Sequence, residues 1–138
     1  MDLIPVKARL NEPRFITLLM PSMFRPTPER AAAKAAAYMR DSRIDAYACR
    51  MNGHDVGLII LRLHENSAEV LNIATDAAFR HMNIGRFLLE QTMVQCCVNA
   101  LEAETDDDAV GFYRRCGFIV ERRGEIDSRA RYRCLKTV

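Results

Sequence analysis

The dipeptide Asn52-Gly53 constrains the fold of this chain more than any other short feature, because it joins two stretches with strand patterns. Residues 44–49 alternate between small or apolar side chains and others, and residues 56–63 form a largely apolar run. Asn-Gly tolerates the positive φ angles that a tight hairpin turn requires at both central positions. We therefore predict an antiparallel hairpin. A second turn at residues 65–67 leads to a third strand of the same meander at 69–75.

The rest of the chain mixes helical and strand patterns. Thr27 as cap and Pro28 in the first turn start a predicted helix that runs to about Arg40. The other predicted elements are strands at 4–9, 101–104, 118–122 and 129–135 and helices at 11–23, 84–100 and 107–115. The helix at 84–100 is apolar around much of its circumference, which predicts burial against a sheet. This order implies an α+β domain with an antiparallel half and one parallel crossover.

The composition indicates one small globular domain over residues 1–138. Its 49% hydrophobic content supplies material for a core, and its net charge of +2 gives no argument for nucleic acid as a partner. A small-molecule or peptide substrate is favoured instead. No secretory pattern opens the chain and no apolar run is long enough to span a membrane, so we expect a cytoplasmic protein without membrane contact.

The cysteines and histidines give no sign of a metal site. The five cysteines are odd in number and show no CxxC spacing, so we expect reduced thiols. The three histidines are isolated from one another in the sequence. No metal is predicted.

The segment at 68–86 carries the strongest chemical signal, because it runs from a strand through a turn into a helix. A helix N-terminus presents unpaired N–H groups and the positive end of the helix dipole, which together suit a phosphate. Arg80 and Arg86 add positive charge, and Gly85 removes a side chain where a pyrophosphate would approach. An ordinary turn with solvated arginines explains the same residues.

A second segment, at 106–118, changes the balance between these readings. Its Ala109, Phe112-Tyr113 and Gly117-Phe118 resemble the second signature of the GNAT acetyltransferases. The earlier segment resembles the CoA-binding motif of that family, with Arg80 and Gly85 at its ends and Asn83 in place of the middle glycine. Both motifs occur in the family's order, and the resemblance extends over almost the whole chain.

The resemblance implies the GNAT fold, a mixed central sheet of about six or seven strands with about four helices on its two faces. It implies acetyl-CoA as the acetyl donor and a primary amine as the acceptor. Homodimers are common in the family and are an expectation here. The residues that the resemblance assigns to CoA are Ile73, Ala74, Thr75, Arg80, His81, Met82, Asn83, Ile84, Gly85 and Arg86.

Two departures from the family pattern bear on the loop and on the second motif. Asn83 replaces a glycine, and asparagine is the non-glycine residue most tolerant of left-handed backbone angles, so we expect the loop to keep its shape. Asp106 replaces the usual asparagine as the cap of the next helix, where the two residues are equivalent.

The resemblance also assigns catalytic roles. Glu69 is the leading candidate for the general base, directly or through a water, with Asn72 or a bound water as alternatives. Tyr113 is the candidate that protonates the departing thiolate, although it could instead only pack against the pantetheine or the core. Cys116 is not expected to act as a nucleophile, because no histidine lies near it in sequence and direct transfer needs no acyl-cysteine.

The acceptor is not identified by the sequence. Arg129, Arg131 and Arg133 alternate along the last predicted strand, either as a charged edge strand or as an attraction for an acidic acceptor. Two functions remain: direct transfer of acetyl from acetyl-CoA to an amine, and a noncatalytic acyl-CoA-binding or regulatory module. Asn83 supports the second function and Tyr113 opposes it. A longer acyl-CoA as donor is a third possibility.

Overall fold

A computed structural model describes residues 1–138 and places the helices and strands in the predicted order. The strands are β1 (Asp2–Pro5), β2 (Ile44–Met51), β3 (His54–Leu63), β4 (Ser67–Thr75), β5 (Ala100–Thr105), β6 (Ile119–Ile126) and β7 (Arg129–Thr137). The helices are α1 (Pro13–Leu19), α2 (Pro28–Arg40), α3 (Ile84–Gln95) and α4 (Val110–Arg115). Short 3-10 turns lie at Lys7–Arg9, Met20–Ser22 and Ala77–Phe79.

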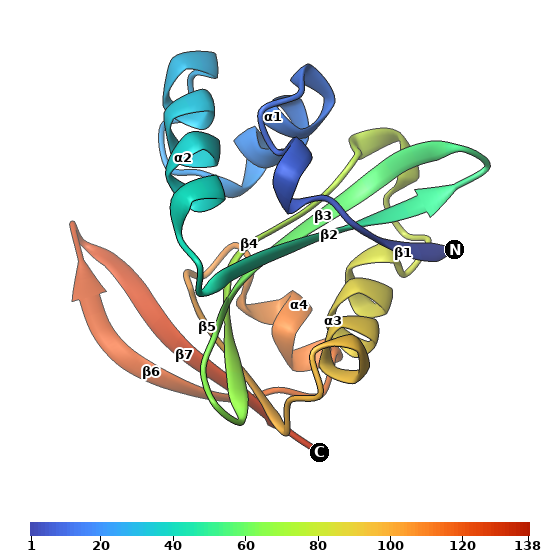
Figure 1. Cartoon of the computed structure of the whole chain (residues 1–138). Coiled ribbons are helices and arrows are strands. Elements are labelled where there is room, and N and C mark those ends of the chain that lie inside the picture. The colour runs from blue at the N-terminus through green and yellow to red at the C-terminus, as the bar shows by residue number, and fades with distance from the viewer.

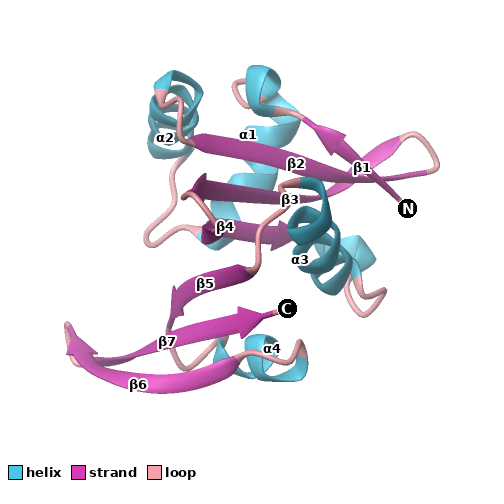
Figure 2. Cartoon of the chain, turned by 60° about the horizontal axis from the view of Figure 1, so that its bottom comes forward, coloured by secondary structure: helices cyan, strands magenta, loops and turns pink.

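The strands form one seven-stranded sheet in the order β1-β2-β3-β4-β5-β7-β6. Only β4 and β5 are parallel, and every other neighbouring pair is antiparallel. Figure 2 shows β1–β4 as one group and β5, β7 and β6 as another. The predicted mixed sheet with an antiparallel half and one parallel crossover is confirmed.

The predicted hairpin at Asn52-Gly53 is confirmed. Met51 pairs with His54, which leaves a two-residue turn between β2 and β3. Asn52 has φ 50° and Gly53 has φ 79°, both in the left-handed region that this kind of turn requires. The turn fixes the first two pairs, and a β-bulge between Cys49 and Arg50 then shifts the register for the buried part of β2 and β3.

Helices cover both faces of the sheet and enclose two apolar cores. Helices α1 and α2 lie on one face and α3 and α4 on the other (Figure 1). The first core contains Phe15, Leu18, Ala31 and Ala35 against β2 and β3, so small alanines let α2 pack closely. The second core contains Leu88 and Leu89 of α3 with residues from the central strands. The predicted burial of α3 is confirmed. No helix is both long and apolar enough to cross a membrane.

The cap predicted for α2 is present. The side chain of Thr27 accepts a hydrogen bond from the backbone N–H of Arg30 at 3.1 Å, and Pro28 is the first helical residue. This cap satisfies one of the N–H groups that a helix start leaves unpaired. The helix ends at Arg40, as predicted.

Several element boundaries differ from the prediction for local reasons. The first strand ends at Pro5, and the helix predicted at 11–23 gives way to a 3-10 turn at Met20, where Pro21 follows. Helix α3 ends at Gln95 instead of residue 100. There, Cys97 has φ 54° and Val98 donates its backbone N–H to the carbonyl of Met93, the pattern of a helix stop that usually carries glycine.

Helix α4 begins at Val110, three residues later than predicted, because the preceding turn has its own cap. The side chain of Asp106 accepts the backbone N–H groups of Asp108 and Ala109 at 3.0 and 3.3 Å. Asp106 therefore caps the turn that leads into α4, while the N-cap of the helix itself is Ala109, without a side-chain bond.

The parallel pairing between β4 and β5 is short. It runs from Ser67 with Ala100 to Val70 with Ala103 and stops there, although β4 continues to Thr75 and β5 to Thr105. The two strands diverge beyond this point, so the edge of β4 that faces β5 has no strand partner from residue 71 onward.

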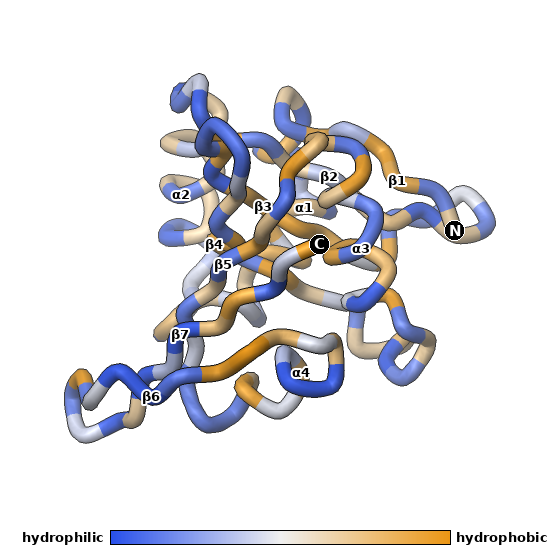
Figure 3. Tube along the Cα trace, turned by 90° about the horizontal axis from the view of Figure 1, so that it is seen from below, coloured by the Kyte–Doolittle hydropathy of each residue, from blue (hydrophilic) through white to orange (hydrophobic).

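The β6–β7 hairpin projects from the body of the protein (Figure 1). The start of β6 is hydrophobic and its far end is largely hydrophilic (Figure 3). Strand β7 pairs with β5 only from Tyr132 to Thr137, and β6 is the last strand of the sheet. The reading of the arginines as a charged edge strand is therefore wrong for Arg133, whereas Arg129 and Arg131 lie beyond the end of β5 and pair with β6 alone.

Leu88→Ala is expected to lower the free energy of unfolding by about 2–5 kcal/mol, because Leu88 is fully buried and its loss leaves a cavity between α3 and the sheet. Val94→Ala, on the same helix but 72% exposed, is the control. It should change the free energy of unfolding by less than about 0.5 kcal/mol. Urea unfolding measures both. Equal effects of the two substitutions would contradict the burial of this face of α3.

Candidate active site

The connection from β4 to α3 forms an uncommon run of free backbone donors. No backbone N–H from Arg80 through Arg86 hydrogen-bonds within the chain. Asn83 has φ 59° and ψ 26°, and His81 has φ 66°. Such left-handed residues among right-handed ones turn successive N–H groups toward one side and create a concave anion site. Asn83 thus takes the left-handed angle that asparagine tolerates best among non-glycine residues.

The start of this loop is fastened to α1. Arg14 donates from Nη2 to Oδ2 of Asp76 at 2.8 Å and from Nε to the carbonyl of Asp55 at 2.9 Å. The Arg14 guanidinium, together with the backbone N–H of Ala78, lowers the pKa of the Asp76 carboxyl below its usual value. Residues from α1, β3 and the end of β4 are thereby held together where the loop begins.

A cavity of about 560 Å³ opens over this loop, and we call it the loop cavity. Arg80, His81, Arg86 and Arg115 contribute cationic or polar groups to its wall. Arg86 is oriented by a hydrogen bond from Nη2 to the carbonyl of Arg115 at 2.5 Å. With the dipole of α3, these groups make the loop cavity favourable for an anion such as a phosphate.

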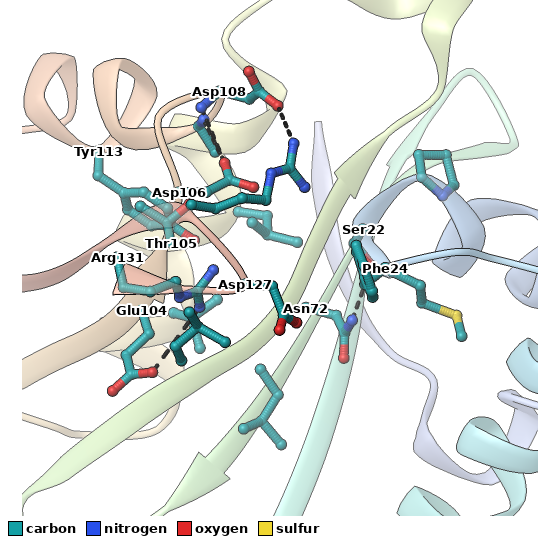
Figure 4. A pocket seen from close by; sticks show the side chains of 18 residues that line it. Ser22, Phe24, Asn72, Glu104, Thr105, Asp106, Asp108, Tyr113, Asp127 and Arg131 are labelled. Atoms are coloured by element: carbon teal, nitrogen blue, oxygen red, sulfur yellow. Dashed lines mark hydrogen bonds and ion pairs between the residues drawn. The ribbon is translucent and has the colours of Figure 1, made fainter. Parts of the chain in front are cut away.

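A second cavity, of about 630 Å³, lies between the α1–α2 connection and the β6–β7 turn, and we call it the hairpin cavity (Figure 4). Its floor includes residues 70–73 of β4, and Glu104 and Thr105 come from the end of β5. The two cavities share the lining residues Pro21, Ile73, Asp108, Ala109 and Tyr113. They therefore adjoin where β4 and β5 have diverged.

Tyr113 stands at the junction of the cavities. It is 5% exposed and packs edge-on against Phe112 and Phe118, with ring centroids 5.2 Å apart in both pairs. Its hydroxyl has no hydrogen-bond partner within the chain. Burial raises the pKa of the phenol well above its ordinary value. Tyr113 thus keeps its proton at neutral pH and presents it where the two cavities meet.

Asn72 is a polar residue fixed in the floor of the hairpin cavity. It is 6% exposed. The hydroxyl of Tyr38 donates to its Oδ1 at 2.5 Å, and its Nδ2 donates to Oγ of Ser22 at 2.9 Å. Burial raises the pKa of Tyr38 to about 12, so this donor stays protonated. The amide retains one further N–H and one acceptor lone pair for another molecule.

Glu69 lies elsewhere. Its carboxylate receives a hydrogen bond from Nη1 of Arg62 at 3.1 Å across the β3–β4 pair, and the residue lines neither cavity. Tyr113 and Asn72 thus line the same cavity, and Glu69 does not. A catalytic role for Glu69 stays a prediction.

Carboxylates neutralise the alternating arginines of β7. Arg129 pairs with Asp108 at 3.5 Å and Arg131 with Glu104 at 4.0 Å. Arg133 pairs with Glu102. These ion pairs link β7 to β5 and to the turn before α4, so the arginines do not form a free positive surface. The hypothesis that these arginines attract an acidic acceptor therefore has no support from the structure.

Cys116 is buried at the edge of the loop cavity. Burial raises the pKa of its thiol, which leaves little thiolate at neutral pH. All five cysteines are free.

Comparison with known proteins identifies the family. A family model described as an acetyltransferase (GNAT) domain matches residues 42–120, more than half of the chain. This chain belongs to the GNAT family of acetyltransferases. The match includes β2 to β5, both motifs and most of the loop-cavity wall, so the resemblance found in the sequence is confirmed. A search of curated protein sequences gave no match.

Solved structures share the fold of this GNAT chain. An acetyltransferase from Thermus thermophilus is 18% identical over 99% of this chain and 96% of that one, with a TM-score of 0.74. An aminoglycoside 6'-N-acetyltransferase complexed with coenzyme A is 15% identical over 99% of this chain and 97% of that one, with a TM-score of 0.75. A GNAT acetyltransferase from Elizabethkingia anophelis with acetyl-CoA bound is 18% identical over 99% of this chain and 97% of that one, with a TM-score of 0.71. The predicted GNAT fold is confirmed.

The GNAT motif residues gather around the loop cavity. Those that line it are Ile73, Ala74, Thr75, Arg80, His81, Asn83, Ile84, Gly85 and Arg86. Met82 does not line it and is 44% exposed. Sequence reasoning left Thr105 and Asp127 of the hairpin cavity unmentioned. The available signal for Thr105 was its place on the buried side of an alternating strand, after Leu101 and Ala103, whereas nothing near Asp127 in sequence pointed to a cavity.

Gly85 of this GNAT motif has a packing role in addition to any contact with an anion. A Cβ atom on Gly85 would lie 2.8 Å from Cε1 and Cζ of Phe112. The ring of Phe112 fills the space that the missing side chain leaves, which brings α4 close to the first turn of α3. Glycine is therefore needed at this position for the contact between the two motifs.

Gly85→Ala is expected to destabilise the protein by about 1–3 kcal/mol, because the new methyl group overlaps the ring of Phe112. Phe112→Leu in the same chain should recover part of this loss by removing the overlapping ring atoms. Urea unfolding of both single variants and the double variant forms a double-mutant cycle. Strictly additive losses would show that the two residues do not contact each other.

Proposed function

We propose that this GNAT protein transfers the acetyl group of acetyl-CoA to a primary amine by direct attack. The observation that carries the proposal is the junction of the two cavities at Tyr113, with free N–H groups on one side and a separate polar cavity on the other. One cavity suits a donor with a diphosphate, and the other leaves room for an acceptor. A longer acyl donor would use the same arrangement.

The donor side fits coenzyme A. The free N–H groups from Arg80 to Arg86 and the side chains of Arg80 and Arg86 would hold the pyrophosphate. The unpaired edge of β4 at residues 73–75 would hydrogen-bond the pantetheine, and a backbone N–H there would polarise the thioester carbonyl. Two structural relatives were solved with coenzyme A or acetyl-CoA bound, which supports CoA as the ligand of this fold.

Tyr113 is proposed as the general acid. Bound acetyl-CoA supplies a thioester, whose carbonyl carbon forms a bond to the amine nitrogen while its C–S bond breaks. Tyr113 is placed to give its proton to the departing sulfur, because its hydroxyl is unpaired and keeps its proton at neutral pH.

The acceptor nitrogen must lose its proton, since an ammonium has no lone pair for attack. We propose that Asn72, held by Tyr38 and Ser22, orients a water that receives this proton. Glu69 is the other base candidate. Glu69 forms an ion pair with Arg62 and lies outside both cavities. It could therefore accept the proton only through intervening waters or side chains.

A noncatalytic acyl-CoA-binding role is the alternative. Its support from the sequence was Asn83, but Asn83 holds the left-handed angle that the loop needs. A free, buried Tyr113 hydroxyl at the cavity junction is not required for binding alone. Measured turnover therefore distinguishes the two functions, because only the enzyme acetylates an amine.

Acetyl-CoA at about 100 times its dissociation constant is expected to stabilise the folded protein by about 2.7 kcal/mol, because it binds the folded state only. Thermal unfolding with and without acetyl-CoA measures the effect, with adenosine as a control ligand that lacks the pyrophosphate. Absence of any rise in Tm would contradict both the enzyme and the binding-module proposals.

Tyr113→Phe is expected to lower kcat at least about tenfold while leaving the dissociation constant of CoA nearly unchanged, because only the proton donor is lost. Tyr132→Phe is the matched control, since Tyr132 lines neither cavity and its hydroxyl bonds to Asp107. Thiol release and CoA titration measure the two quantities. An unchanged kcat in Tyr113→Phe would exclude the general-acid role.

A further inference from the structure

The hairpin cavity carries more negative than positive side chains. Four carboxylates line it, against two guanidinium groups, Arg129 and Arg131. The carboxylates are Glu104, Asp106, Asp108 and Asp127. A cavity with this excess attracts a cation and repels an acid.

The ion pairs inside the cavity show which carboxylates remain available. Glu104 and Asp108 are paired with Arg131 and Arg129. Asp106 uses one oxygen, Oδ1, to cap the turn before α4, and has no cationic partner. Asp127 makes no ion pair or hydrogen bond and lines the cavity from the β6–β7 turn (Figure 4). Two carboxylates from different walls are thus free to meet positive charge.

Two hydroxyls without a partner face the same space. Thr105 is 8% exposed and Tyr113 is 5% exposed, both line the cavity, and neither hydroxyl has a partner within the chain. Neither oxygen is among the fully enclosed unpaired atoms of the chain, so both remain open to the cavity, where a ligand can hydrogen-bond to them. Both lie next to Asp106 in the wall formed by β5 and α4.

Between these polar groups the cavity is apolar. Val70, Leu71 and Ile73 belong to its floor. Phe24 and Ile126, on opposite walls, are 65% and 61% exposed and add apolar surface to the cavity. Methylene groups of a ligand would cover apolar surface that now contacts water.

From these features we infer that the acceptor is a linear diamine or polyamine, with one amino group near Asp106 and Tyr113 and a second positive group at Asp127. This inference rests on the proposed acetyl transfer. Carboxylates at two places meet the two charges, and the apolar surface between them receives the methylene chain. An amino acid or acidic peptide would place its carboxylate against Asp127, which is unfavourable.

Three compounds with the same four-carbon chain test the charge at the far end: 1,4-diaminobutane, n-butylamine and 4-aminobutanoate. We expect kcat/KM to fall in that order, with the diamine about two- to fivefold above n-butylamine per amino group. The preference should shrink at high salt, because an exposed ion pair is screened. Equal kcat/KM values for the three compounds would overturn the inference.

Asp127→Asn locates the second charge. Asp127 has φ 52°, and asparagine keeps this backbone angle and the shape of the side chain. The variant should lose most of the preference for 1,4-diaminobutane while its kcat/KM for n-butylamine stays within about twofold. Glu65→Gln, which removes the same charge from an exposed turn outside both cavities, should keep the preference. Equal behaviour of the two variants would overturn the role of Asp127.

Calorimetric titration of the three compounds, with and without CoA, separates this inference from the proposed function. Tighter binding of 1,4-diaminobutane than of n-butylamine supports the acceptor class even if no compound is acetylated. Equal binding overturns it even if all three are acetylated. Failure of acetyl-CoA to bind contradicts the proposed function. The order in which the three compounds bind then still decides whether the acceptor class is correct.

Discussion

The divergence of β4 from β5 is the constraint on which the site depends. The two parallel strands pair from Ser67 to Val70 and then separate, so backbone groups that a continuous sheet would satisfy are left free. Both cavities lie along this opening, and Ile73 belongs to both. A sheet fully paired at this point would have no place for either ligand. The antiparallel pairs on each side hold the two halves in place.

The opening is useful because rigid, buried elements surround it. Helix α3 is anchored by Leu88 and Leu89, so its first turn cannot shift to find partners for its N–H groups. Gly85 and Phe112 pack α4 against that turn, and α4 carries Tyr113 to the junction. One apolar core thus fixes both the loop with free N–H groups and the side chain proposed as proton donor, which is the kind of rigid support that a preorganised site needs.

Most elements and the loop cavity could be predicted from local sequence. Asn52-Gly53 and Thr27-Pro28 act through their own backbone preferences, so the turn and the helix start appeared as predicted. The stop of α3 at Cys97 was missed because a non-glycine residue takes the left-handed angle there. The separation of Glu69 from the cavities was also missed, because the ion pair with Arg62 depends on strand register.

The sequence by itself determined the order of elements, the anion-binding loop and the family, because these depend on contiguous residues and their local preferences. Only the tertiary structure decided the character of the hairpin cavity. The arginines of β7 and the acids of β5 are far apart in sequence, and pairing between the strands neutralised the arginines. It also left Asp106 and Asp127 as the unpaired charges. Charge in a cavity is a sum over residues that only folding brings together, so no local pattern could predict it.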